Sequence, residues 1–269
     1  MYTVKSGDTL TGIARRHNIR LEDLLRLNPG IKYPDRIHPG DRIHLGTETP
    51  KPPAGAPNPS PWAAWAQPRK PAPLSDTDWG DAVKEYKIGR AELEAVAEVE
   101  SGASAWLEVG HPPHYRPKIL FEAHVFSRRT GGKWDLTHTN ISQPRWNRAV
   151  YRGGIGEYAR LESAMALDRI RALESASWGR FQIMGFNHEA AGFDTVEGFV
   201  QAMFQSERQQ FRTFLAFLTD KGLHRFLRSR DWEAFAKGYN GPAAEQNRYA
   251  ERLQRAYLRA VARLSRRLA

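Results

Sequence analysis

The sequence predicts an α+β protein with two folded units of unequal size. Residues 1–45 follow the order strand, helix, helix, strand, which predicts a small βααβ unit. Residues 46–75 are dominated by proline and alanine, and such a stretch forms an extended linker that cannot build a core. Residues 76–269 repeat apolar side chains at helical spacing and show few strand signals, which predicts a mostly α-helical domain with a sizeable core.

The composition excludes several classes of protein. The chain of 269 residues has no cysteine, so it has no disulfide or thiolate chemistry, and its formal net charge is +10. No stretch approaches the ~18 apolar residues of a membrane span, and the N-terminus lacks the basic and apolar regions of a signal peptide. A basic surface attracts nucleic acid, anionic lipid or an anionic wall polymer. Because no zinc finger or RNP motif is present, we expect no nucleic acid partner.

The N-terminal unit begins with a strand candidate at residues 2–4. A turn at 6–9 can cap a first helix, and leucines between 21 and 27 support a second helix that stops at residues 28–30. A turn then leads into an alternating strand at 42–45. In the linker that follows, two tryptophans at positions 62 and 65 could dock on a domain or contact a ligand.

Three spaced motifs in this unit resemble a LysM domain: Tyr-Thr-Val-x-x-Gly-Asp-Thr-Leu-x-x-Ile-Ala, Leu-x-x-Leu-Asn-Pro and Ile-x-Pro-Gly-Asp-x-Ile. The resemblance covers residues 1–45 and implies a βααβ fold that binds glycans containing N-acetylglucosamine, such as peptidoglycan. It places the sugar contacts on two loops, formed by Gly7, Asp8, Thr9 and Leu10 and by Asn28, Pro29, Gly30 and Ile31. The alternative is that these residues only begin and end helices. Both interpretations can hold, because backbone groups exposed at such loops can bind sugar amides.

The stretch Glu92–Gly102 carries the first candidate catalytic group of the larger domain. An apolar stripe at helical spacing begins at Leu93 and ends with the carboxyl group of Glu100, and Gly102 follows where a helix should stop. Burial and the negative end of a helix both disfavour a charged carboxylate, so they raise the pKa of Glu100 toward that of a general acid. The alternative is a helix-terminal glutamate that reaches solvent.

A second candidate acid, Glu122, lies in the strongly apolar run Lys118–Phe126. A buried acid is rare unless it is paired or functional, and the alternative for Glu122 is an ion pair with Arg116 or Arg128. This run belongs to the segment Ser104–Arg152, which is rich in proline, glycine, histidine and tryptophan. We expect that segment to be irregular and to form part of a cleft.

Two further motifs supply groups that suit a sugar. Within Glu174–Gly185, Trp178 offers a flat face for a sugar ring and Gln182 can hydrogen-bond an acetamido group. The alternative is that the small residues of this motif allow a tight helix contact. The stretch Gly238–Pro242 is a polar turn after a helix, and its alternative is a simple helix stop.

In this order, Val-Glu-Ser-Gly, Ser-Trp-Gly-x-Phe-Gln-Ile-Met-Gly and Tyr-Asn-Gly resemble the lysozyme superfamily, including goose-type lysozymes and lytic transglycosylases. With Lys-Ile-Leu-Phe-Glu-x-His-x-Phe and Glu-Ser-Ala-Ser-Trp-Gly, residues 76–269 resemble the N-acetylmuramidase domain of modular phage endolysins that lyse Gram-negative hosts. The resemblance implies a lysozyme-like fold and cleavage of the β-1,4 bond between N-acetylmuramic acid and N-acetylglucosamine. It further implies synthesis in the host cytoplasm and action on the periplasmic cell wall.

The resemblance assigns Glu100 as the catalytic acid. Glycoside hydrolysis usually uses two carboxylates, and Glu122 is the candidate for the second, with Asp135 as the reserve. Without a second acid nearby, the sugar's own 6-hydroxyl would attack and give the 1,6-anhydro product of a lytic transglycosylase. The residues expected to hold the glycan are Ser177, Trp178, Gln182, Tyr239 and Asn240.

The C-terminal run Arg248–Leu268 predicts an amphipathic helix. Its expected apolar face consists of Leu253, Tyr257, Val261, Leu264 and Leu268. Arginines crowd the other faces, and a basic amphipathic helix can contact lipopolysaccharide or a membrane. The alternative is the last helix of the domain, with its apolar face inward and its arginines in water.

Two other functions are alternatives to glycan cleavage. The presence of His111, His114, His124 and His138 suggests a zinc amidase or peptidase. These histidines lack the His-Glu-x-x-His spacing or a comparable one, so we expect no metal and no cofactor. A non-catalytic glycan-binding protein, in which both units only anchor, would release no new reducing ends. We expect a monomer whose partner is the glycan strand of peptidoglycan.

Overall fold

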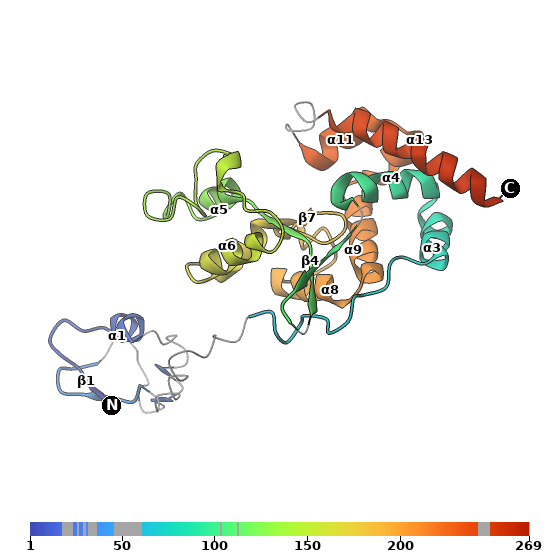
Figure 1. Ribbon diagram of the computed structural model, residues 1–269. Coiled ribbons are helices and arrows are strands. Elements are labelled where there is room, and N and C mark those ends of the chain that lie inside the picture. The colour runs from blue at the N-terminus through green and yellow to red at the C-terminus, as the bar shows by residue number, and fades with distance from the viewer. Residues whose placement is uncertain are drawn as a thin grey trace. The chain divides into compact units, whose positions relative to one another are not determined.

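The computed structural model describes residues 1–17, 24–25, 27–28, 31, 37–45, 61–102, 104–111, 113–241 and 248–268 (Figure 1). The chain forms two compact units, Met1–Pro61 and Trp62–Ala269. Within those described ranges, no helix is long and apolar enough to cross a membrane. The fold class is α+β, as predicted from the sequence.

The N-terminal unit pairs two short strands beside a helix. Strand β1 (Tyr2–Thr3) is antiparallel to β2 (Arg42–Ile43), and helix α1 (Leu10–Arg16) lies between them in the sequence. Apolar side chains of α1, of β2 and of neighbouring residues meet in one core, which consists of Val4, Leu10, Ile13, Ala14, Leu24 and Ile43. The described leucines of the predicted second helix have helical backbone conformations, and the rest of that helix lies outside the described residues.

The larger unit is mostly helical. Its α-helices are α3 (Asp76–Tyr86), α4 (Arg90–Ser101), α5 (Ala123–Arg129), α6 (Gly156–Met165), α7 (Arg169–Glu174), α8 (Val196–Gln205), α9 (Glu207–Asp220), α10 (His224–Ser229), α11 (Trp232–Asn240) and α13 (Tyr249–Leu268). Its strands are β3 (Trp106–Val109), β4 (His114–Pro117), β5 (Ile119–Phe121), β6 (Ala176–Trp178) and β7 (Ile183–Met184). The described residues of this unit also contain two short 3₁₀ helices, η1 (Arg148–Val150) and η2 (Gly185–Asn187).

The segment 104–152, predicted to be irregular, contains three of these strands and helix α5. Strands β3 and β4 form an antiparallel hairpin, and β5, β6 and β7 form a second antiparallel sheet in which Leu120 lies opposite Ser177. The prediction is wrong for these elements because strands of three or four residues are too short to show a clear alternation of apolar and polar side chains.

Part of the predicted linker belongs to the larger unit. The ring of Trp62 is fully buried, and it stacks on Phe204 with centroids 5.6 Å apart and planes 9° from parallel. Trp62 Nε1 also donates to Glu162 Oε1 at 2.6 Å. The linker predicted for residues 46–75 is therefore too long, because two tryptophans supply enough apolar surface to dock residues 62–74 on the helical domain.

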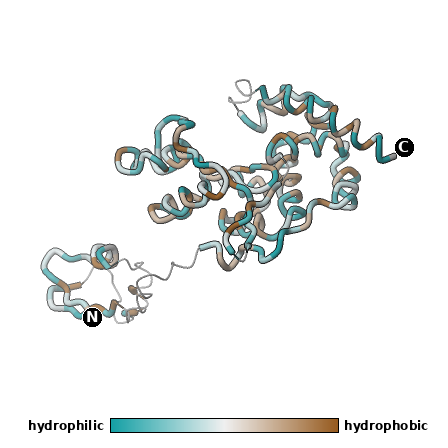
Figure 2. The backbone as a smooth tube through the Cα atoms, viewed as in Figure 1, coloured by the Kyte–Doolittle hydropathy of each residue, from teal (hydrophilic) through white to brown (hydrophobic). Residues whose placement is uncertain are grey.

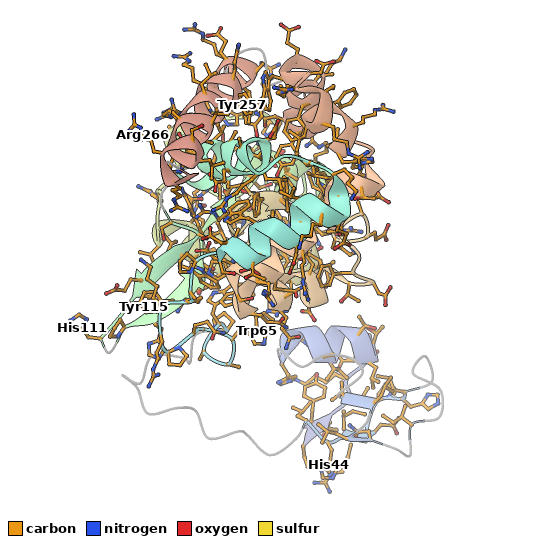
Figure 3. The ribbon with its side chains drawn as sticks, turned by 90° about the vertical axis from the view of Figure 1, so that its right-hand side faces the viewer. His44, Trp65, His111, Tyr115, Tyr257 and Arg266 are labelled. Carbon is orange, nitrogen blue, oxygen red and sulfur yellow. The ribbon has the colours of Figure 1, made fainter. Side chains whose placement is uncertain are left out.

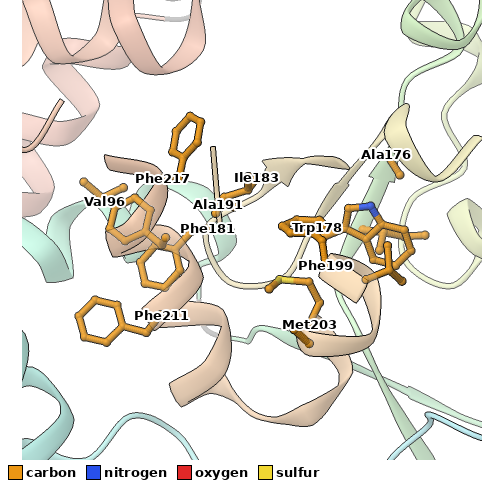
Figure 4. Packing of buried hydrophobic residues seen from close by; sticks show 14 of the residues in the cluster. Val96, Ala176, Trp178, Phe181, Ile183, Ala191, Phe199, Met203, Phe211 and Phe217 are labelled. Atoms are coloured by element: carbon orange, nitrogen blue, oxygen red, sulfur yellow. The ribbon is translucent and has the colours of Figure 1, made fainter. Parts of the chain in front are cut away.

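A core rich in aromatic side chains holds the helical unit together. Figure 4 shows Trp178 packed beside Phe199 and Met203, and Phe181 beside Phe211. The rings of Phe181 and Phe211 are stacked with centroids 5.5 Å apart. Since Trp178 and Phe181 flank the turn from β6 to β7, this packing fixes the position of that turn against α8 and α9.

Helix α4 follows the predicted stripe. Leu93, Val96 and Ala97 are almost fully buried, and the helix ends at Ser101, where the amide of Gly102 donates to the carbonyl of Glu98. Gly102 has a φ of +62°, a region that L-residues other than glycine rarely adopt. Gly102 therefore ends the helix at Ser101, so that Glu100 lies in the last turn of α4.

Helix α13 packs along α4, and the prediction of its apolar face needs a correction. Its buried residues are Tyr249, Leu253, Ala256 and Ala260. Val261, expected on the buried face, is 38% exposed, and most residues of the helix are hydrophilic (Figure 2). The buried stripe contains two alanines because small side chains allow the two helices to approach closely. The prediction is wrong because it assigns the larger apolar residues Val261 and Leu264 to the buried face.

Candidate active site

The carboxyl group of Glu100 lies at the contact between α4 and α13. The residue is partly exposed overall, but its carboxyl end is enclosed, and Tyr249 Oη of α13 donates a hydrogen bond to Oε1. Burial raises the pKa of Glu100 to about 7, against the opposing effects of the Tyr249 hydrogen bond and of the cations Arg252 and Lys118. A carboxyl group with this pKa retains its proton near neutral pH, as a general acid must.

A second tyrosine lies next to this pair. The ring of Tyr239, at the end of α11, stacks on the ring of Tyr249 with centroids 6.5 Å apart and planes 12° from parallel. Tyr239 Oη donates to the carbonyl of Phe181 at 2.5 Å. This contact joins α11 to the turn between β6 and β7, so the predicted residue Tyr239 is in the neighbourhood of Glu100.

The turn between β6 and β7 carries Ser177 and Gln182, which contact each other. Ser177 Oγ donates to Gln182 Oε1 at 2.9 Å, and Gln182 Nε2 donates to the carbonyls of Gly179 at 2.8 Å and Lys118 at 3.3 Å. Gln182 has a φ of +47°, which its side-chain contacts help to hold. Because the Gln182 amide already bonds the chain at Lys118, it links this turn to a residue whose charge acts on Glu100.

Trp178 does not occupy a position where it could stack on a sugar. Its side chain is 1% exposed, and its Nε1 donates to the carbonyl of Leu173 at 3.2 Å. The ring belongs to the core described above, because a small strand with both faces covered buries every side chain. The prediction that Trp178 stacks on a sugar ring is therefore wrong, because its ring is buried in the core.

Asn240 is the last residue of α11 and is exposed. The next residue, Gly241, has a φ of +62° and ends the helix. The remainder of the predicted turn, from Pro242, lies outside the described residues.

Glu122 belongs to a different set of contacts from Glu100. It precedes the first residue of α5, Tyr151 Oη donates a hydrogen bond to its Oε2, and His124 Nδ1 lies 3.3 Å from the same oxygen. In Figure 1, α5 and α6 lie on one side of the short strands, and α4, α11 and α13 lie on the other. The side-chain partners of Glu122 are thus Tyr151 and His124, and not Arg116 or Arg128 as the alternative predicted.

Asp135, the reserve candidate, is engaged in a loop. Its two carboxylate oxygens accept hydrogen bonds from Ser142 Oγ at 2.6 Å and from Ser127 Oγ at 3.0 Å. These bonds tie the chain after α5 to the end of that helix. Asp135 therefore has a structural role in this loop, and its role as the reserve catalytic acid stays a prediction.

The first predicted sugar-binding loop of the N-terminal unit is built around Asp8. Asp8 accepts hydrogen bonds from Tyr2 Oη at 2.7 Å and from the amide of Lys5 at 2.8 Å, and it pairs with Arg16. The hydrogen bond from Arg16 contributes most to lowering the pKa of Asp8 to about 2. In the same loop, Gly7 has a φ of +85°, and Thr9 caps α1 by accepting from the amide of residue 12 at 3.0 Å.

The side chains of Leu10 and Asn28 face inward. Leu10 is 1% exposed in the core, and Asn28 bonds the carbonyls of Leu24 and His44, both at 2.7 Å. Only the backbone of these two residues is thus available for a sugar. Ile31 packs partly against the core, and the predicted positions Pro29 and Gly30 lie outside the described residues.

The sequence analysis did not identify Tyr249, Lys118 or Arg252 as neighbours of Glu100. Lys118 was inside a recognised motif, but no local pattern relates residue 249 to residue 100. Over the described part of the chain, no three His, Asp or Glu side chains come together as metal ligands would. The groups that these contacts and charges bring to Glu100 are therefore two tyrosines and two cations.

Comparison with known proteins identifies the families of both units. The family model for N-acetylmuramidase matches residues 89–261, and that for the LysM domain matches residues 2–46. Endolysins of the Bacillus phages PZA and B103 are 52% identical over 44 residues and 47% identical over 45 residues, but these matches cover only 17% of each relative.

A solved structure gives a longer match. The crystal structure of the Burkholderia AP3 phage endolysin aligns with a TM-score of 0.62 at 37% identity, over 75% of this chain and 74% of that chain. This identity is high enough, over enough of both chains, to indicate more than a shared fold. The chain belongs to the N-acetylmuramidase family and carries a LysM domain ahead of its muramidase domain.

Proposed function

We propose that this protein is an endolysin that hydrolyses the β-1,4 bond between N-acetylmuramic acid and N-acetylglucosamine in the peptidoglycan of a Gram-negative host. The observation that carries the proposal is the enclosed carboxyl group of Glu100, whose pKa burial raises to about 7. The likeness to the endolysin of a Burkholderia phage supports the choice of host class. The protein acts as a monomer on glycan strands of the periplasmic wall and requires no nucleic acid.

In the proposed mechanism, Glu100 protonates the glycosidic oxygen while the bond to the anomeric carbon breaks. Positive charge then develops on the sugar ring, and a water attacks the anomeric carbon. After the transfer, the charged Glu100 carboxylate is stabilised by the hydrogen bond from Tyr249 and by Arg252 and Lys118. Gln182, Tyr239 and Asn240 are proposed to border the path of the glycan, whereas Ser177 is buried and supports Gln182 through its hydrogen bond.

The base that activates water is proposed to be Glu122. It is partly exposed, and the Tyr151 hydroxyl and His124 hold its carboxylate. A specific observation favours the runner-up, a lytic transglycosylase that forms 1,6-anhydro products. The charged groups that act on Glu100 are two cations. Glu122 directly precedes α5, and α5 lies on the other side of the short strands from α4 (Figure 1).

The decisive experiment is mass spectrometry of the muropeptides that the protein releases from purified wall. Hydrolysis by a muramidase gives reducing-end N-acetylmuramic acid, whereas a transglycosylase gives 1,6-anhydro ends. We expect the Glu100→Gln variant to release at least about a hundredfold less product, and the Glu108→Gln variant, altered at an exposed glutamate of β3, to act normally. Normal lysis by Glu100→Gln would refute the proposal.

A second substitution tests the role of Glu122. If it is the base, the Glu122→Gln variant loses about a hundredfold in kcat, and the matched change at the exposed Glu108 has little effect. If the wild-type products carry 1,6-anhydro ends and Glu122→Gln retains its kcat, the transglycosylase route replaces hydrolysis.

The N-terminal unit is proposed to hold the enzyme on the wall through the backbone of its two loops. Contact of α13 with lipopolysaccharide or a membrane receives little support. Arg259 pairs with Glu98 at 2.6 Å and Arg263 pairs with Glu94 at 2.5 Å, so these guanidinium groups already contact α4. Arg266, labelled in Figure 3, is exposed and remains available. If the wild type permeabilises outer membranes and the Arg266→Glu variant does not, α13 does contact lipopolysaccharide or the membrane.

A further inference from the structure

The first residue of α13 closes over the last turn of α4. Tyr249 is 3% exposed, and its hydroxyl donates to Oε1 of Glu100, a residue 149 positions away in the sequence. The ring is held from its other side by the parallel ring of Tyr239. Tyr249 therefore has little freedom to move away from the carboxyl group.

The remainder of α13 determines where Tyr249 lies. Leu253, Ala256 and Ala260 are fully buried, which fixes the rotation of the helix. Arg252 donates to the carbonyl of Val99 at 3.1 Å, so it bonds the residue next to Glu100. The ion pairs Arg259–Glu98 and Arg263–Glu94 add two further contacts between α13 and α4. Together these contacts fix the position of α13 along α4.

We propose that Tyr249 is the positioning residue for Glu100, and that α13 serves as a part of the active site that holds this tyrosine in place. A donor on Oε1 leaves Oε2 as the oxygen that carries the proton, because a neutral carboxyl group has one proton and Oε1 is occupied as an acceptor. The hydrogen bond thus selects which oxygen faces the glycosidic bond. The inference rests on the proposed role of Glu100 as the acid.

The groups around Glu100 define the electrostatic consequence. They are Tyr249 and Arg252 from α13, Tyr239 from α11, and Lys118 between β4 and β5. Burial, and then the charge of Glu100, raise the pKa of Tyr249 well above its usual value, so its hydroxyl keeps its proton and remains a donor. A donor favours the charged carboxylate, so losing this hydrogen bond raises the pKa of Glu100 further.

The test compares Tyr249→Phe with Tyr257→Phe in the full-length protein, by kcat and KM against pH on purified peptidoglycan. Tyr257 lies on the same helix (Figure 3), and its hydroxyl accepts from Arg230 Nη1 at 3.0 Å, so the control removes one hydroxyl from the same element. We expect Tyr249→Phe to move the alkaline limb of the kcat profile up by about one pH unit. Its maximal kcat should fall about tenfold with KM nearly unchanged, while Tyr257→Phe follows the wild type.

A second variant has the opposite expected sign and does not depend on losing a buried hydroxyl. Replacement of Tyr249 by 3,5-difluorotyrosine gives a stronger donor, so the alkaline limb should move to lower pH. An alkaline limb that coincides with that of the wild type in either variant overturns the proposal and leaves Tyr249 with a packing role. Failure of the proposed function is distinct, because then the wild type itself releases no new glycan ends or Glu100→Gln remains active.

Discussion

Glu100 occupies a position where opposing influences act on the pKa of one carboxyl group. Burial favours the neutral acid, whereas the hydroxyl of Tyr249 and the cations Arg252 and Lys118 favour the carboxylate. Burial contributes the largest effect, and the resulting pKa of about 7 lets the group give up its proton and later recover it at the same pH. A carboxyl group without these neighbours would be too reluctant to ionise after the transfer.

The raised pKa makes a prediction about stability. Because the folded-state pKa of Glu100 is about 7 against a reference of 4.5, the contribution of this group is fully present below pH 4.5 and is lost as the pH rises through 7. In urea denaturation, we expect Glu100→Gln to exceed the wild type in free energy of unfolding at pH 8.5 by up to ~3 kcal/mol. At pH 4 the two proteins should nearly coincide, and an equal difference at both pH values would contradict the assignment.

At the scale of elements, the turn between β6 and β7 depends on a glycine. Gly179 has a φ of +74°, and a Cβ built on it would lie 2.7 Å from Oε1 of Gln210. Gln210 is buried and cannot easily move, since it accepts from the amide of Arg180 at 2.7 Å and donates to the carbonyl of Met203 at 2.8 Å. Close packing and backbone conformation therefore both require glycine at this position.

We expect Gly179→Ala to lower the free energy of unfolding by about 1–3 kcal/mol and to reduce kcat, because the turn that carries Gln182 shifts. Equilibrium denaturation and wall-lysis kinetics measure the two effects. Gly131→Ala is a suitable comparison, because its φ is also positive, +64°, but its added Cβ would meet no atom within 4 Å. Equal losses in the two variants would show that backbone strain alone matters.

The docked tryptophan segment gives a second expectation at this scale. Trp62→Ala removes a fully buried ring and its hydrogen bond to Glu162, so the free energy of unfolding should fall by about 3–5 kcal/mol. Because Trp65 is only partly buried, Trp65→Ala should lower the free energy of unfolding by less than Trp62→Ala does. If the Trp62→Ala protein is as stable as the wild type, the docking of residues 62–74 does not stabilise the domain and these residues act as linker.

At the scale of the whole molecule, the proposed binding and catalysis are assigned to two separate compact units. Each has its own apolar core, and the boundary falls between Pro61 and Trp62. The larger unit contains Glu100 and all of the neighbours that adjust its pKa. Separate cores indicate that each unit can fold without the other.

We accordingly expect residues 62–269 alone to be folded and to cleave short soluble glycan fragments at the full-length rate. On intact wall the truncated protein should act more slowly, because binding by a linked second module raises the local concentration of the enzyme. Sedimentation with purified wall measures the binding. Loss of cleavage on the soluble fragments would mean that the N-terminal unit contributes to catalysis itself.

The sequence by itself determined the features that depend on neighbours along the chain. The stripe that ends at Glu100, the stop at Gly102 and the strand and helix order of the small unit follow from helical spacing and glycine conformation. The two families were likewise recognisable from spaced motifs. Such signals are local, so they survive without knowledge of the fold.

Tertiary structure alone decided which side chains meet. It placed Trp178 in the core instead of on the surface, docked Trp62 on the domain, and brought Tyr249 to Glu100 across 149 positions. It also placed Ala256 and Ala260, not Val261, against the neighbouring helix. These outcomes depend on the close packing of distant segments, and a periodic pattern within one segment contains no information about the shape of the surface that it will meet.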